Sequence, residues 1–351
     1  ITGAMRGRRT KVFTFGFGSD AEEEMLKTIA ETTQAQYYHV ASDERIAHAF
    51  GNCIGGLVSV VAQNVTLTLT HGAHATVAKV HGSYPTTVDP ATHTTVVELG
   101  DLYGEEKKNL LLDLTLPPLE TPVGSEDVVK ASLTYFDARE YRSVTRTTTL
   151  RIARPAETPM DQKVNVEIDE QINRLRLADA MQEATRVGDA GDVAQGQKVV
   201  RDAVAAVLLT PSGGADGLPL TPLIAALVKD ARALEKGFES TAAYRAMGAK
   251  ATKSASQALH AERSNTESGG VYQNEAQVQY RSLAAAAADE KEEPRNNVAS
   301  PLAGLAAPPL VRSMAGGSPP PAASSTSSSP LANTKWSAAR PTTLSPSCAA
   351  T

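Results

Sequence analysis

The sequence predicts a multidomain chain: a partial, doubly wound parallel α/β sheet, an antiparallel β-sandwich-like module, a helical segment and a disordered tail. Three observations lead to this prediction. Strand-like and helix-like patterns alternate in 1–64, apolar and polar residues alternate with a period of two in 65–155, and 156–284 has helical periodicity. Residues 285–351 are rich in Pro, Ser and Ala, and they lack the apolar surface that would offset the entropy of ordering.

The first region has the pattern of an open parallel sheet. Residues 12–18 form a short apolar run that ends in glycines, as in a strand buried between helices. Asp20, with Glu23 three residues later, predicts the start of a helix. Residues 36–40 form the next strand, and Asp43 precedes a second helix. The apolar residues of that helix recur at three-to-four spacing: Ile46, Phe50, Ile54, Leu57 and Val61.

Segments 15–20, 36–40 and 49–65 together resemble the last third of a von Willebrand factor A (VWA) domain. They resemble in particular an intracellular VWA group in which the domain runs into a β-rich module and a helical region called Vwaint. The resemblance extends over residues 11–284. Members of that group stand beside RING or U-box modules, or beside hedgehog/intein-like modules. The resemblance therefore implies a VWA–Vwaint type protein, truncated at its N-terminus, with 1–64 as the C-terminal portion of its VWA domain.

The same resemblance implies that a complete VWA domain binds a divalent metal, but this chain lacks residues that match the metal site. VWA domains bind a divalent cation through an Asp-x-Ser-x-Ser loop, a Thr and a further Asp, and no residue here matches those positions. We predict no catalytic, cofactor-binding or metal-ligating residue, and a divalent metal only where the missing N-terminal VWA portion is present. Ser19 and Asp20 are interpreted as helix caps. The chain begins with Ile1 rather than Met, so we expect upstream sequence; without it, the strand edge and apolar helix faces are expected to be exposed.

The second region contains short alternating segments separated by Gly, Pro and Asp. The predicted strands are 65–70, 75–80, 94–99, 109–116, 128–135 and 143–152. We interpret the charged segment 100–109 as a solvated hairpin tip, with a partner-contact loop as the alternative. The histidines of this region are expected to be structural or surface residues rather than zinc ligands, because no Cys is near and they do not share one strand face: His71, His74, His81 and His93.

The third region predicts a Vwaint-like helical segment over 156–284. A Gly-containing break at 188–192 separates two amphipathic stretches, which indicates an antiparallel helix pair. Thr221 followed by Pro222 predicts the start of another helix. A helix pair of this kind also resembles one unit of a helical repeat, but no second copy occurs at a fixed period.

Composition and motifs exclude several classes of function. The net charge of -5 is unfavourable for binding nucleic acid, and no apolar run approaches the ~20 residues of a membrane span. Only Cys53 and Cys348 are present, which excludes a disulfide framework and favours a cytoplasmic setting. Cys53 is expected to be a small buried hydrophobic residue. The motifs Gly-x-Ser-x-Gly, His-Glu-x-x-His and Cys-x-x-Cys and the Walker loop do not occur.

We therefore expect a non-enzymatic protein-interaction scaffold that binds a protein partner. Two alternatives stay open. One is an accessory segment of a larger enzyme, either a ubiquitin ligase or a hedgehog/intein-like self-processing protein, whose catalytic module is missing. The other is a secreted, matrix-associated protein like the inter-alpha-trypsin inhibitor heavy chains.

Overall fold

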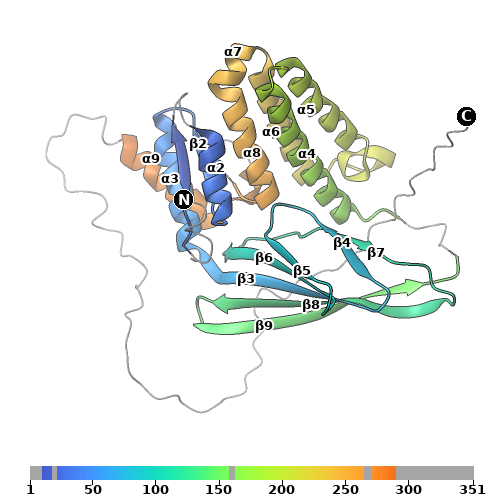
Figure 1. Cartoon of the computed structure of the whole chain (residues 1–351). Coiled ribbons are helices and arrows are strands. Elements are labelled where there is room, and N and C mark those ends of the chain that lie inside the picture. Colours follow the sequence, from blue (N-terminus) through green and yellow to red (C-terminus); the bar gives the residue numbers. More distant parts are fainter. Residues whose placement is uncertain (1–9, 18–21, 158–162, 265–269, 290–351) are drawn as a thin grey trace, which may run out of the picture.

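The structure opens with an α/β unit. The computed structural model describes residues 10–17, 22–157, 163–264 and 270–289. The first elements are β1 (Thr14–Phe17), α2 (Glu23–Thr32), β2 (Tyr37–Val40) and α3 (Glu44–Val58) (Figure 1). β1 and β2 pair in parallel, as their order with the helices predicts.

Two details of this unit differ from expectation. α3 ends at Val58, and Val61 already belongs to the following strand, so the predicted helical stripe is too long by one turn. Asp43 stands at the N-cap of α3 but makes no side-chain capping hydrogen bond. Ser19 and Asp20, predicted as caps of the first helix, lie outside the described residues.

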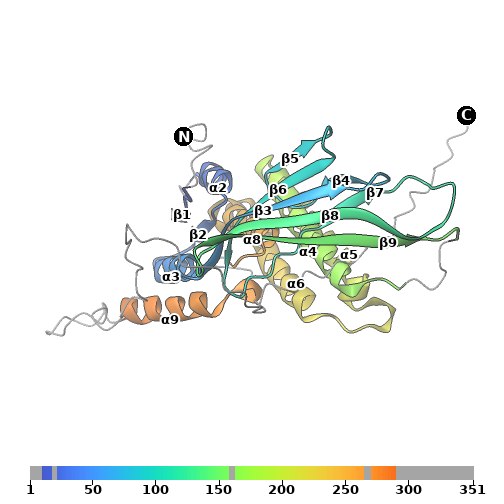
Figure 2. The ribbon, with the colours of Figure 1, turned by 90° about the horizontal axis from the view of Figure 1, so that it is seen from below.

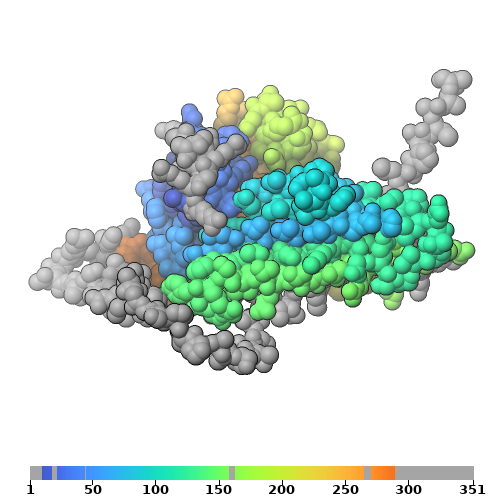
Figure 3. Space-filling view, turned by 60° about the horizontal axis from the view of Figure 1, so that its bottom comes forward, coloured from blue at the N-terminus to red at the C-terminus, as the bar shows by residue number. Residues whose placement is uncertain are grey.

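The strands of the second region form two packed layers (Figure 1). The elements are β3 (Val60–His71), β4 (Thr76–Val80), β5 (Thr86–Asp89), β6 (Thr94–Tyr103), β7 (Leu112–Thr115), β8 (Val123–Asp137) and β9 (Arg142–Arg154). The larger layer is antiparallel with the order β5-β6-β3-β8-β9, and β4 pairs with β7 in the smaller one. Apolar residues of both layers pack together, among them Leu69 and Val97 from the larger and Val77 and Leu114 from the smaller. The opposite face of the larger layer lies at the surface (Figure 3).

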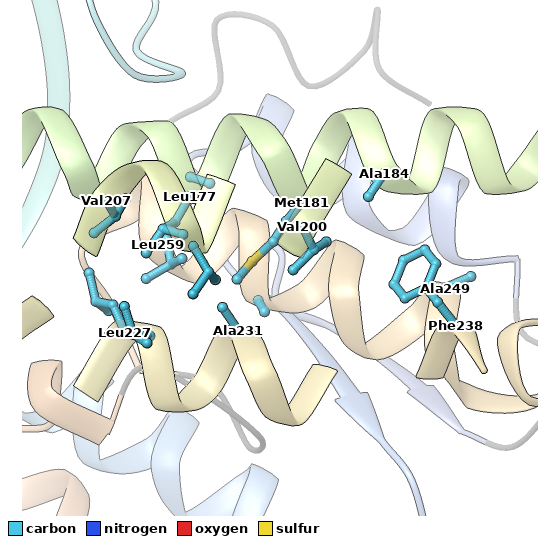
Figure 4. Close-up of a cluster of buried hydrophobic side chains, with 14 of the residues drawn as sticks. Leu177, Met181, Ala184, Val200, Val207, Leu227, Ala231, Phe238, Ala249 and Leu259 are labelled. Carbon is cyan, nitrogen blue, oxygen red and sulfur yellow. The ribbon is translucent and has the colours of Figure 1, made fainter. Parts of the chain in front are cut away.

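The helical region begins with a long antiparallel pair. Its helices are α4 (Val166–Asp189), α5 (Val193–Leu208), α6 (Pro222–Glu235), α7 (Thr241–Ala243), α8 (Ala249–Ala261) and α9 (Glu275–Asp289). α4 and α5 are separated by the predicted glycine-containing break, and the Asp192 carboxylate accepts from the backbone N–H of Gln195 at the start of α5. α4, α5, α6 and α8 share a core of buried aliphatic residues (Figure 4). α9 includes 285–289, which the sequence assigns to the disordered tail, and 290–351 lie outside the described residues.

The last two helices return to the beginning of the chain. α8 packs between α4 and β2, and α9 lies along α3 (Figures 1 and 2). Backbone and side-chain bonds join these distant segments: Gln36 donates to the Ser264 carbonyl at 2.7 Å, and the Tyr37 N–H donates to Gln257 at 2.9 Å. The C-terminal helices therefore cover part of the α/β unit, which the sequence predicts to be bare.

Candidate interaction surface

One side of α3 is apolar and exposed. Phe50, Ile54, Leu57 and Val58 are 43%, 43%, 46% and 51% exposed. We call these four residues the α3 stripe. The opposite side of the helix is buried, with Ala49 and Cys53 packed against Tyr38 and Val40 of β2. The large apolar residues in the second half of α3 thus face outward, whereas Ala49, Cys53 and the partly buried Ile46 face the core.

The glycines of α3 explain this orientation. A Cβ at Gly51 would lie 2.6 Å from the Tyr280 carbonyl oxygen, and one at Gly55 would lie 2.5 Å from the Gln277 Cα. α9 therefore approaches the α3 backbone more closely than any side chain on these positions permits. With its glycine side against α9 and its Ala–Cys side against β2, α3 turns the bulky stripe toward solvent.

The stripe adjoins an edge of the parallel sheet. Among the described strands, β1 has β2 as its only neighbour. The ring of Phe15 in β1 stacks on Phe50 at a centroid distance of 4.3 Å, and it also stacks on Tyr38 at 5.1 Å. Phe17, the last residue of β1, is also exposed. Within the described residues, an edge of β1 without a strand neighbour thus adjoins an apolar helix face, a combination typical of protein-contact surfaces.

The charged segment 100–109 is not a solvated hairpin tip, nor is it free as a partner-contact loop. Arg263 Nε donates to Glu106 Oε1 at 2.9 Å, and Lys108 Nζ lies 2.8 Å from the same oxygen. Both the Glu106 and Lys108 side chains are buried. The Arg263 guanidinium also lies 4.1 Å from the centroid of the Tyr103 ring. The sequence prediction is wrong here because the partner cation comes from the end of α8, far along the chain.

A second buried pair extends this junction. Arg174 of α4 lies 2.8 Å from Glu262, and both side chains are almost fully buried. Asn109 donates to the same carboxylate from its backbone and its side chain, at 3.0 and 2.9 Å. Burial alone raises the pKa of Glu106, but the positive charges of Arg263 and Lys108 outweigh it and hold that pKa at about 2. The pKa of Glu262 is raised, because its burial outweighs the nearby positive charges of Arg174 and Lys108. The junction thus joins the β6–β7 connection, α4 and the end of α8 through buried acid–base pairs.

The histidines of the β region do not form one group, although the backbone N–H of His71 donates to the His93 carbonyl at 2.9 Å. His74 Nδ1 lies 2.9 Å from Glu126, His81 Nε2 lies 2.9 Å from Asp113, and His71 Nε2 lies 3.0 Å from the Thr95 hydroxyl. His93 adopts a left-handed turn conformation with φ of 51°. In the part of the chain that the structure describes, no three His, Cys, Asp or Glu residues are grouped as metal ligands.

Cys53 lies on the buried side of α3, as predicted. Its side chain packs in the small core of the α/β unit, and burial raises the pKa of the thiol to about 11. A thiol with this pKa stays protonated at neutral pH, so it acts as a small hydrophobic residue rather than a nucleophile.

Comparisons with known proteins give partial likenesses. No family model matches the chain. A segment of 78 residues is 36% identical to the E3 ubiquitin-protein ligase WAV3 of Arabidopsis thaliana; it makes up 21% of this chain and 10% of WAV3. The chain therefore spans only a small part of that relative.

Two solved structures are similar over part of their length. One is a von Willebrand factor type A protein from Catenulispora acidiphila, with a TM-score of 0.49 and 16% identity over 61% of this chain and 50% of that one. The other is the ArnB paralog VWA2 from Sulfolobus acidocaldarius, with a TM-score of 0.37 and 14% identity over 74% of this chain and 59% of that one. Within the described residues, no helix is both long and apolar enough to cross a membrane.

Proposed function

We propose that this chain is a non-enzymatic protein-interaction scaffold of the VWA–Vwaint type. In this proposal, β1 to α3 are the rear part of a VWA unit, the β layers follow it, and α4 to α9 form the Vwaint-like region. The observation that carries the proposal is the α3 stripe beside the open edge of β1. Exposing apolar surface to water is unfavourable by about 25 cal/mol for each Å². A partner that covers the four large apolar side chains of the α3 stripe removes this unfavourable free energy.

The geometry suggests how a partner is held. A parallel sheet is normally covered on both faces and continued by further strands. A partner that adds a strand to β1 and lays a helix over the α3 stripe satisfies both requirements at once.

The experiment compares two surface variants with the natural chain. The double variant Ile54→Lys/Leu57→Lys places two charges on the stripe, whereas Leu209→Lys is the matched control because Leu209 is 79% exposed at the end of α5, away from the stripe. Proteins captured from the source cells are quantified by mass spectrometry. We expect specific proteins to be retained by the natural chain and by Leu209→Lys, and to fall at least tenfold with the double variant. Equal retention by all three chains would contradict the proposal.

A magnesium titration tests the metal part of the proposal. We expect no saturable heat of Mg²⁺ binding to this chain, because no residue of its sequence matches the Asp-x-Ser-x-Ser loop and because its described residues hold no group of three His, Cys, Asp or Glu side chains. Saturable binding at micromolar to millimolar Mg²⁺ would show that a cation site is built from this chain alone.

A second candidate function is substrate recruitment within a ubiquitin ligase, favoured by the 36% identity to WAV3 over 78 residues. Here the chain supplies a contact surface, and the ligase activity resides in a module that it does not contain. We expect the chain alone to leave a ubiquitin-charged E2 enzyme undischarged. Fused to a RING domain, it should direct ubiquitin to the captured proteins, and Ile54→Lys/Leu57→Lys should abolish that transfer. Transfer that is unaffected by the double variant would rule out the stripe as the recruiting surface.

A further inference from the structure

His39 is buried where the α/β unit meets the helical region. It lies in β2, and its side chain is 1% exposed. Tyr38 and Val40 face α3, so Tyr37 and His39 face the opposite side of the strand, where α8 packs. Neither ring nitrogen of His39 has a hydrogen-bond partner among the described residues. A buried imidazole without a partner is uncommon and needs an explanation.

The charges around His39 oppose its protonation. Lys250 of α8 and Glu23 of α2 are the charged groups that act on the ring, and Tyr37 is the titratable neighbour on its own strand. Lys250 Nζ lies 3.0 Å from Glu23 Oε1, so the carboxylate already neutralises one cation. β1 contributes no charge at this point, because the residue opposite His39 is Gly16. A protonated His39 ring would therefore be a second buried cation, and it would share the single carboxylate of Glu23 with Lys250.

We propose that the contact between α8 and β2 is an acid-sensitive latch, closed when His39 is neutral and opened by its protonation. Opening exposes the imidazolium to water and removes it from the Lys250 charge, so proton binding favours the open form. Polar ties cross the contact: the bonds from the Tyr37 N–H to Gln257 and from Gln36 and Asn52 to the Ser264 carbonyl, the Glu31–Gln257 bond, and the ion pairs of Lys250 with Glu23 and of Lys253 with Glu24. An interface of this composition separates more readily than an apolar core.

The direction and range of the pH effect follow from linkage. Burial, reinforced by the Lys250 charge, lowers the pKa of His39 from 6.5 to about 4. The free energy by which neutral His39 favours the closed form is therefore fully present above pH 6.5. It declines as the pH falls from 6.5 to about 4, and it is constant below that. If the open form has an ordinary histidine pKa, the ratio of open to closed molecules rises roughly 25-fold between pH 7.5 and pH 5.

The junction of ion pairs keeps this opening local. The pKa of Glu106 is held at about 2, so its bonds to Arg263 and Lys108 persist throughout the range in which His39 titrates. The end of α8 thus stays attached to the β6–β7 connection while its first turns leave β2. Acidification to pH 5 is expected to loosen one contact and leave the β layers and the helical core intact.

Hydrogen exchange of the full chain tests the latch. After correction for the intrinsic pH dependence of exchange, segments 36–40 and 249–257 should exchange about tenfold faster or more at pH 5 than at pH 7.5, while 128–136 should not change. His39→Gln, which cannot be protonated, should remove the difference. His81→Gln, a histidine bonded to Asp113 at the surface, should retain it. The same acceleration in His39→Gln, or none in the natural chain, would overturn the proposal.

A second measurement does not depend on the folding of a variant. The ring protons of His39 in the natural chain can be followed by NMR as the pH is lowered. A midpoint below pH 5, accompanied by shifts of the α8 residues, supports the latch. A midpoint near 6.5 shows that the ring is already hydrated, and a shift confined to the ring shows that α8 does not respond.

Discussion

The helical region and the α/β unit are stabilised in different ways: the first by a core of its own, and the second by segments from elsewhere in the chain that pack on it. The helical region has its own core, in which residues such as Leu177, Leu227 and Leu259 are fully buried between four helices (Figure 4). The buried core of the α/β unit is much smaller, and the largest apolar residues of α3 face outward. It depends on α8, α9 and the junction of ion pairs, all of which come from elsewhere in the chain. The comparison shows that one region is stabilised by what it buries within itself and the other by what is docked onto it.

The largest expected effect is at the junction. In Arg174→Met, the Glu262 carboxylate stays buried without its cation, and we expect a loss of about 3–5 kcal/mol in the free energy of unfolding, measured in urea. Replacing both partners, as Arg174→Met/Glu262→Leu, removes the buried charge and should restore most of that loss. If Arg174→Met lowered the free energy of unfolding by less than about 1 kcal/mol, the Arg174–Glu262 pair would not be what joins α4 to the end of α8.

A deletion in the helical core should cost slightly less. Leu227→Ala leaves a cavity among α4, α5, α6 and α8, and we expect a loss of about 3 kcal/mol. Hydrogen exchange should show the loss in the helices first, with α2 and β2 affected only when the helical region opens globally. Equal acceleration of both regions at low denaturant would mean that they share one core.

The contact between α3 and α9 gives an intermediate effect. Gly55→Ala introduces a Cβ 2.5 Å from the Gln277 Cα, and we expect α9 to shift at a cost of about 1–3 kcal/mol. Alanine favours the helix itself, so any net loss reports the packing. Gly124→Ala is the matched control, since a Cβ there meets nothing within 4 Å, and it should leave α9 protected from exchange. A stabilised Gly55→Ala chain would mean that α9 is not tightly docked.

The smallest effect on stability is expected at the α3 stripe. Ile54→Lys/Leu57→Lys should change the free energy of unfolding by less than about 0.5 kcal/mol for each substitution, because both side chains are largely in water. A loss of several kcal/mol would show that the stripe is part of the core and not a surface for partners.

Local pattern predicted the elements well. The parallel β1 and β2, the antiparallel strands and the α4–α5 pair all follow from residue periodicity and turn signals. β5 was missed because all four of its residues are exposed, so the strand has no alternation to detect. The exposure of the α3 stripe agrees with the expectation of bare apolar helix faces in this unit, whereas the close approach of α9 to Gly51 and Gly55 on another side of α3 was not expected.

The junction and His39 could not be predicted from the sequence. Glu106 and Arg263 are 157 residues apart, and no local signal pairs them. In the sequence, 100–109 is a charged run and His39 is one residue of an apolar strand. The end of α8 brings Arg263 to segment 100–109, which becomes a buried ion network. The packing of α8 on β2 buries His39 between these two elements.

Photo-crosslinking tests the central claim, that the α3 stripe is a contact surface, most directly. A benzophenone amino acid is placed at position 57 in one chain and, in another, at position 209, which is more exposed and stands at the end of α5. The proposal predicts discrete protein adducts from position 57 that are absent from position 209 and that disappear with Ile54→Lys. The same adducts from both positions, or none from position 57, would contradict it.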